Sequence, residues 1–335
     1  MKTRTFRWSV SIVILLALVL LAVILSLCTG TARISPPEVF SMLFEKGDSL
    51  EKAIVFDIRL PRVLLGLAVG GALSLAGVIL QGMFRNPLVE PYTLGISGGA
   101  ALGVCLGIVF KASEYTGAWS LPACGFAGAA VTVMLVYWLS TRRSVLSIRN
   151  MLLTGVMISF ISSSLVMLIM ALSSQEQLHG IIFWIMGSLA EPEPGLASAA
   201  LAASVVTLGI SYLFAMDLNA LSLGEDEAQH LGVNVELTKK CLFVLASVAT
   251  GFSVSAAGVI GFVGLVVPHF LRMFLGSDHR ILLVTSFLCG GAFLVFCDTL
   301  AKTIADPVEL PVGVITGIVG GSIFVYALSR RRVGM

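Results

Sequence analysis

The sequence predicts an all-α, polytopic membrane protein with about ten membrane-spanning helices. Three observations support this class. Apolar residues make up 57% of the 335 residues and charged residues only 12%, the mean hydropathy is +0.99, and none of the 19 carboxylates falls in the middle of one of the ten apolar stretches into which the chain divides. A soluble globular domain would carry far more charge.

The predicted spans follow one another with short connections, and each is long enough to cross a bilayer in whole or in part. Residues 93–111 follow Pro87 and Pro91, and residues 260–275 contain Pro268, so we expect partial helices packed inside protein there. The apolar segment 178–189 is too short to cross and predicts a re-entrant or surface helix. The spans are 8–28, 60–84, 93–111, 117–140, 146–172, 195–215, 237–257, 260–275, 280–302 and 312–330.

The basic residues predict the orientation of the chain. With the N-terminus inside, 14 of the 21 Lys and Arg residues fall on the cytoplasmic side and 7 on the other. This two-to-one ratio satisfies the positive-inside rule with both termini cytoplasmic. The first span, at about 20 residues, is long for a signal peptide and is expected to be retained. Residues 1–335 therefore form a single membrane domain, with a cytoplasmic loop at about 217–240.

Internal similarity and glycine spacing bear on how the spans pack. A shift of 181 residues superposes residues 74–79 on 255–260 and Pro87 on Pro268. Chance similarity between apolar segments is one explanation, and an inverted repeat that pairs the second span with the seventh is the other. Glycines four residues apart place a bare backbone strip on one helix face, which favours close packing within the chain over dimerisation. They are Gly66 and Gly70; Gly99, Gly103 and Gly107; and Gly313, Gly317 and Gly321.

The patterns that an enzyme or a metalloprotein requires are missing from the sequence. It contains no G-x4-G-K-[ST] phosphate loop, no HExxH and no GxSxG, its four histidines lack ligand spacing, and its six cysteines lack CxxC spacing. We therefore expect no cofactor, no metal and no catalysis in this chain. The net charge of +2 gives no reason to expect a nucleic-acid partner.

Six ordered motifs extend over nearly the whole chain, and together they resemble the FecCD-type permeases. These proteins are the membrane subunits of binding-protein-dependent ABC importers for ferric siderophores, haem and cobalamin. The motifs are RLPRVL at 59–64, QGMFRNPLVEPYTLGISGGA at 81–100, FWIMGSL at 183–189, LGEDEAQHLGV at 223–233, GFVGLVVPHFLR at 261–272 and ELPVGVITGIVG at 309–320.

The resemblance implies a set of partners. It implies that two copies of the permease surround a central pathway in the bilayer, with two cytoplasmic subunits that bind ATP and Mg²⁺ and one extracytoplasmic substrate-binding protein. The substrate would be a metal chelate: an iron chelate (ferric siderophore or haem) or cobalamin. A gradient-driven secondary transporter is the alternative. The lack of carboxylates in the middle of the spans argues against it, because such transporters usually keep one there as the coupling site.

Two cytoplasmic motifs carry roles that the resemblance implies. Two prolines and Asn86 forbid a continuous helix between the second and third spans, and the resemblance places Asn86, Pro87 and Leu88 at a cytoplasmic gate. In LGEDEAQHLGV the acidic residues begin a short helix that Gly232 ends, with Ala228 and Leu231 on one face. The resemblance makes this helix the contact with the ATPase, through Gly224, Glu225, Ala228, Leu231 and Gly232.

Arg59, Arg62 and Lys302 are cations on the outer side, where the positive-inside rule disfavours them. One interpretation is that they anchor helix ends by reaching toward lipid phosphates. The resemblance implies the other, in which these residues pair with carboxylates of the binding protein. Lys302 stands where the family often has arginine, so it keeps the charge but lacks the bidentate fork.

Overall fold

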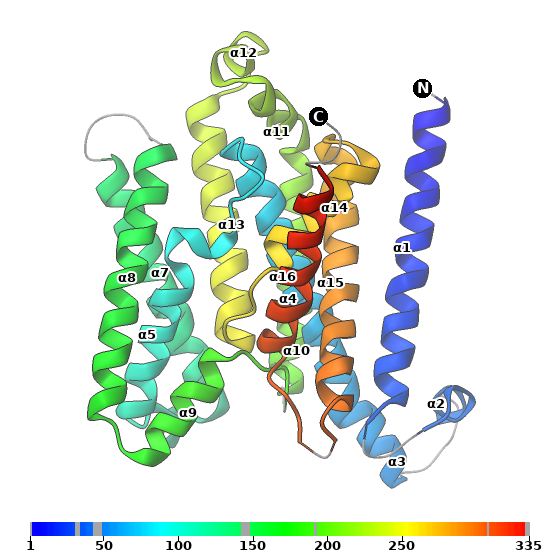
Figure 1. Ribbon diagram of the computed structural model, residues 1–335, viewed down its shortest axis with the longest axis vertical. Coiled ribbons are helices and arrows are strands. Elements are labelled where there is room, and N and C mark those ends of the chain that lie inside the picture. The colour runs from blue at the N-terminus through cyan, green and yellow to red at the C-terminus, as the bar shows by residue number, and fades with distance from the viewer. Residues whose placement is uncertain are drawn as a thin grey trace.

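The computed structural model describes residues 2–30, 34–42, 49–141, 148–190, 193–306 and 308–331. Within these ranges every regular element is helical. The long helices run side by side along the vertical axis of the molecule, and the N- and C-termini lie at the same end as the short helix α12 (Figure 1). The predicted fold class is therefore confirmed.

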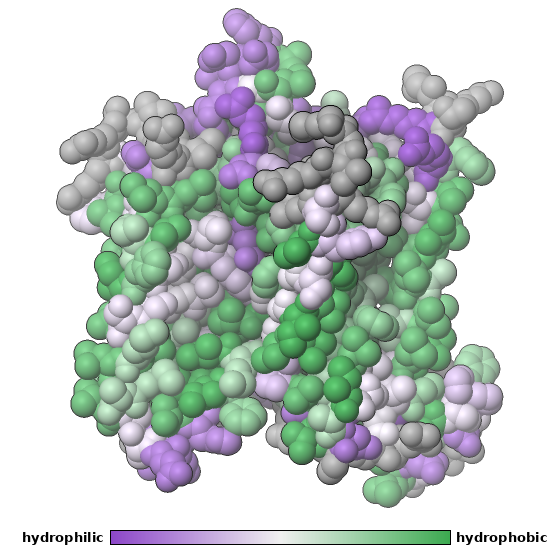
Figure 2. All heavy atoms as spheres, viewed as in Figure 1, coloured by the Kyte–Doolittle hydropathy of each residue, from purple (hydrophilic) through white to green (hydrophobic). Residues whose placement is uncertain are grey.

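Among the residues that the structure describes, seven helices are long and apolar enough to cross a membrane, and three shorter apolar helices, α5, α14 and α16, bring the total to the ten predicted. On the face shown in Figure 2, apolar side chains cover the middle of the molecule, and hydrophilic residues lie at both ends. The helices that correspond to the ten spans are α1 (Lys2–Cys28), α4 (Leu60–Met83), α5 (Ile96–Val109), α7 (Ser120–Thr141), α8 (Ile148–Leu172), α10 (Pro194–Leu213), α13 (Val235–Ala257), α14 (Val263–Leu275), α15 (His279–Thr303) and α16 (Val312–Arg331).

Short helical elements connect these spans at the two ends of the molecule. The apolar segment after α8 forms α9, which a capping box at Ser174 begins: the Ser174 hydroxyl accepts from the Gln177 N–H, and the Gln177 side chain accepts from the Ser174 N–H. The predicted non-spanning helix is thus present. The connecting elements are α2 (Pro36–Met42), α3 (Leu50–Ala53), η1 (Ile54–Arg59), η2 (Pro91–Leu94), α6 (Ala112–Thr116), η3 (Gly117–Trp119), α9 (Gln175–Ile185), α11 (Ala215–Leu223) and α12 (Glu225–His230).

Helix α4 is the centre of the fold. Of its 24 residues, 21 are buried, and α10, α13, α14 and α15 all pack against it. Its glycines permit this, because a Cβ on Gly70 would overlap the Gly290 carbonyl of α15, and one on Gly77 would overlap the Gly264 carbonyl of α14. Gly103 of α5 packs in the same way on the Cys124 carbonyl of α7. The glycine strips of α4 and α5 therefore serve packing within the chain, as predicted, whereas Gly317 in the strip of α16 has no atom within 4 Å of where a Cβ would lie.

Helices α5 and α14 are the two partial helices predicted from the prolines. With 14 and 13 residues they are about 20 Å long, less than the roughly 30 Å of a bilayer core. Each follows a long helix, α4 or α13, after an irregular segment, and the two pairs run in opposite directions across the molecule (Figure 1). The sequence match does not align them, however. Residues 74–79 lie inside α4, whereas residues 255–260 extend past the end of α13.

Candidate functional site

Helices α11 and α12 form a cap that stands out beyond the other helices, at the end of the molecule where both termini lie (Figure 1). Gly224 joins them with φ 152° and ψ 160°, a conformation that is essentially restricted to glycine. Gly232 ends the cap with φ 87°, and the Val233 N–H donates to the Ala228 carbonyl at 3.0 Å. This bond is that of a Schellman motif, so Gly232 stops the helix as predicted.

The apolar residues of the cap do not share one environment. Ala228 is fully buried against the rest of the protein, whereas Leu231 is 65% exposed. The expectation that they lie on one face is therefore wrong, because Leu231 already belongs to the turn that follows α12. Leu223, just before Gly224, is 67% exposed as well. The tip of the cap thus presents two large apolar side chains to the solvent.

An ion pair attaches the cap to a membrane-spanning helix. The Glu225 carboxylate pairs with the ammonium of Lys239 on α13, whose side chain is only 5% exposed. The acidic residues Asp226 and Glu227 are exposed beside it. The backbone angles at position 224 are strained for any residue that carries a side chain. The cap therefore has a fixed shape and a fixed connection to α13.

A second polar cluster holds the cap against α15. Asn219 of α11 donates to Asp278 Oδ1 at 3.1 Å, and its own carbonyl oxygen accepts from the His279 backbone N–H at 2.9 Å. Asp278 also pairs with Arg4 and Arg280. The hydrogen bond from Arg280 holds the pKa of the Asp278 carboxyl below its usual range, and the one from Asn219 lowers it further. No sequence signal indicates this cluster, because Arg4, Asn219 and residues 278–280 are far apart in the chain.

The turn after α4 contains the predicted gate residues. The Asn86 side-chain oxygen accepts from the Leu88 N–H at 3.0 Å, and the Asn86 N–H donates to the Gln81 carbonyl at 3.2 Å. Asn86, Pro87 and Leu88 are all exposed. The structure thus gathers the three in a stiff Asx turn on the same side as the cap, and their action as a gate stays a prediction.

Arg59, Arg62 and Lys302 come together at the opposite end of the molecule. Each is less than 10% exposed. The Arg62 guanidinium pairs with Asp298 at 2.9 Å and with Glu309 at 2.7 Å. The remaining contacts reach α1 and α15: Lys302 lies 3.4 Å from Asp298 and donates to Ser26 at 3.0 Å, and Arg59 donates to the Leu27 carbonyl at 2.6 Å.

The burial of these cations was not part of either interpretation of the sequence, lipid anchoring or pairing with the binding protein. The cations are part of an internal junction between α1, α4, α15 and the segment before α16, in which Asp298 pairs with Arg62 and Lys302, and Glu309 pairs with Arg62. Sequence reasoning missed both carboxylates. The spacing of Asp298 and Lys302, one helical turn apart near the end of a span, was the available signal. The docking role of the three cations stays a prediction.

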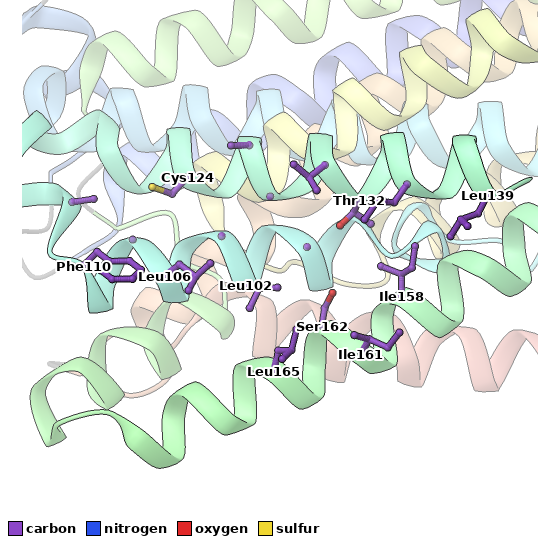
Figure 3. Close-up of a pocket in the computed structure, with 18 residues that line it drawn as sticks. Leu102, Leu106, Phe110, Cys124, Thr132, Leu139, Ile158, Ile161, Ser162 and Leu165 are labelled. Atoms are coloured by element: carbon purple, nitrogen blue, oxygen red, sulfur yellow. The ribbon is translucent and has the colours of Figure 1, made fainter.

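Two apolar cavities lie among the membrane helices. The larger, of about 720 Å³, lies between α5, α7 and α8, and Leu106, Leu139 and Ile161 are among the residues that line it (Figure 3). The smaller, of about 430 Å³, lies between α5, α8 and α9 and includes Met167 and Met170. No charged residue lines either cavity within the described parts of the chain.

The arrangement of helices identifies the class of protein as a permease of the ABC transporter type. The fold superposes with a TM-score of 0.85 on a solved structure described as an inward-facing conformation of a metal-chelate type ABC transporter. The two chains are 31% identical, and the match covers 95% of this chain and 98% of that one.

The chain belongs to the FecCD transport family, whose model matches residues 18–330. Among similar proteins, the hemin transport system permease HmuU of Yersinia pestis is 41% identical over 83% of this chain and 84% of its own length. The cobalamin import system permease BtuC of Halobacterium salinarum is 40% identical over 84% of this chain and 75% of its own length. The vitamin B12 import permease BtuC of Citrobacter koseri is 36% identical over 99% and 96% of the two chains.

Proposed function

We propose that this chain, as a homodimer in the bacterial cytoplasmic membrane, moves a metal chelate inward when partner subunits hydrolyse ATP. The observation that carries the proposal is the cytoplasmic cap. It exposes Leu223 and Leu231 at the tip of a permease fold, while Glu225 anchors it to α13. Exposed leucines on a rigid protrusion are suited to a protein groove, since they gain from burial there.

The ATPase supplies the chemistry, and this chain supplies the pathway. Two ATPase subunits would each seat one cap of the dimer, and Mg²⁺ and ATP would be bound there. When nucleotide closes the ATPase pair, the caps move with it, and the spans that carry them alternate between outward and inward access. The gate turn at Asn86, Pro87 and Leu88 would close the cytoplasmic end in the resting state.

The proposed substrate is an iron chelate, a ferric siderophore or haem, with cobalamin as the other candidate. Uncharged cavity walls at membrane depth support a large chelate with apolar surface. An extracytoplasmic binding protein would deliver it to the outer end of the spans. Measuring which chelates bind the cognate binding protein separates these substrates.

Reconstitution tests the function as a whole. The permease is purified with the cognate ATPase and binding protein, placed in liposomes, and assayed for chelate uptake with and without ATP. We expect uptake that requires ATP and is insensitive to proton and sodium ionophores. Uptake that follows an ion gradient without ATP would establish a secondary transporter instead. Gly224→Val should abolish ATP-driven uptake, because valine cannot adopt the φ of 152° and ψ of 160° at that position without strain, and the strain distorts the cap.

A further inference from the structure

A proline in α14 leaves one backbone carbonyl without its helical partner. Pro268 lies four residues after Gly264 and has no N–H, so the Gly264 carbonyl lacks the donor that an α-helix normally provides. In the structure the side chain of Gln81 takes that place. Its Nε2 donates to the Gly264 carbonyl at 3.1 Å, and Gln81 is only 3% exposed.

The same amide also binds the turn that follows α4. Nε2 of Gln81 donates to the Val89 carbonyl at 3.2 Å, while its Oε1 accepts from the Arg272 guanidinium. Because guanidinium only donates, Arg272 fixes which way the amide faces. Both donors and the acceptor of one buried side chain are therefore in use. The partners belong to two elements, the turn 84–90 and helix α14.

The backbone around Gln81 is shaped for this contact. Gly77, one turn earlier on α4, lets the Gly264 carbonyl approach the helix so closely that a Cβ at position 77 would overlap it. The Gln81 carbonyl in turn accepts from the Asn86 N–H at 3.2 Å. The turn is thus held at its start by the backbone of Gln81 and at its end by the side chain of Gln81.

We propose that Gln81 is a positioning residue that transmits movement between α14 and the gate turn Asn86–Leu88. The proposal rests on the proposed function, because a gate exists only in a transporter. Since one amide holds both carbonyls, α14 cannot slide along α4 without pulling on Val89. The proline makes the link necessary, because without Gln81 the Gly264 carbonyl would be buried and unsatisfied.

Thiol labelling of the gate measures this transmission. Leu88 is 55% exposed and is replaced by cysteine in the reconstituted complex with the ATPase. The labelling rate is compared with and without a non-hydrolysable ATP analogue, and the same proteins without the new cysteine correct for native thiols. In the otherwise unchanged protein we expect nucleotide to change the rate. In Gln81→Leu we expect that change to shrink roughly three- to tenfold, the effect of losing one or two buried hydrogen bonds.

Two further variants separate transmission from mere stability. Thr285→Val is the matched control, since the Thr285 hydroxyl is equally buried but bonds the Ile281 carbonyl of its own helix. It should leave the nucleotide response unchanged. Pro268→Ala restores an N–H for the Gly264 carbonyl, so in that background Gln81→Leu should regain part of its lost thermal stability, while Arg272 and Val89 stay without their bonds to Gln81. The nucleotide response should stay small, because the bond to Val89 is still missing.

The outcomes distinguish this inference from the proposed function. A full nucleotide response in folded Gln81→Leu would overturn the positioning role, and failure of Pro268→Ala to recover stability would overturn the account of the Gly264 carbonyl. Failure of the starting protein to bind the ATPase or to transport with ATP would overturn the proposed function instead. A purely structural role for Gln81 predicts lower stability with an unchanged response.

Discussion

The buried junction at the outer end predicts which carboxylate the fold depends on. Asp298→Asn removes the negative charge that Arg62 and Lys302 share, and Asp298 is only 2% exposed. Removing one partner from a buried ion pair typically costs about 3–5 kcal/mol. At about 1.4 kcal/mol per factor of ten, the ratio of folded to unfolded protein should fall at least roughly a hundredfold.

Glu309→Gln is the matched control, because it makes the same chemical change next to the same guanidinium. The Glu309 side chain is 49% exposed and lies 2.7 Å from Arg62. Solvent screens such a pair, so we expect a cost of only about 0.2–1 kcal/mol. The large difference between the two variants would show that burial, and not the number of ion pairs, sets the contribution of each carboxylate.

Unfolding by SDS titration in mixed micelles measures both variants, with size-exclusion chromatography as a check on the folded fraction. A pull-down with the binding protein at two ionic strengths is run on the same samples. We expect Asp298→Asn to unfold at clearly lower SDS, with docking of the surviving folded protein retained. If Asp298→Asn were as stable as the starting protein while docking was lost, the cations would serve the binding protein and the junction would not be structural.

Three further predictions concern the end of the molecule that carries the cap. Glu225→Lys should uncouple ATP hydrolysis from uptake, because it replaces the attraction between Glu225 and Lys239 of α13 with a repulsion. Asp226→Lys, on the exposed side of the same helix, should have a much smaller effect, and parallel ATPase and uptake assays compare the two variants. Ala228 is buried, so Ala228→Leu should destabilise the protein by roughly 1–3 kcal/mol through overpacking. Leu231 is exposed, so Leu231→Ala should change the free energy of unfolding by less than about 0.5 kcal/mol and should weaken ATPase binding in a pull-down. Folding lowers the pKa of Asp278, so the contacts of its carboxylate contribute fully to stability above the unfolded pKa of about 3.9 and are lost only as pH falls through the lower folded pKa. In thermal melts, the difference in stability between the unchanged protein and Asp278→Asn should therefore be constant from pH 7 to about pH 5. A decline of that difference within this range would contradict the assignment.

Element type and number were predictable because lipid imposes simple rules. Ten apolar stretches gave ten helices, and the two segments that proline interrupts became the partial helices α5 and α14. The stop at Gly232 was also predictable, since a helix end requires only local backbone geometry. In each case the deciding interaction lies within a few residues of the signal.

The environment of individual side chains was not predictable, because it depends on contacts between distant segments. Arg62 is buried only because Asp298, 236 residues later, and Glu309 lie beside it. Ala228 is buried and Leu231 is exposed because α12 ends between them and the following turn directs Leu231 outward. Composition and spacing do not show which distant residues of the chain lie close together in the fold. The same basic residues can therefore form an exposed docking surface or a buried junction without any difference in the sequence pattern.

The cap and the gate turn are connected through the helices that surround α4. Glu225 joins the cap to α13, and Asn219 joins it to the start of α15. Both α13 and α15 pack along α4, at whose end the gate turn begins. A force on the cap therefore reaches α4 from two sides. Because polar contacts rather than a flexible loop hold the cap in place, we expect it to move with α13 and α15 as one rigid body, which is what coupling to a distant ATPase requires.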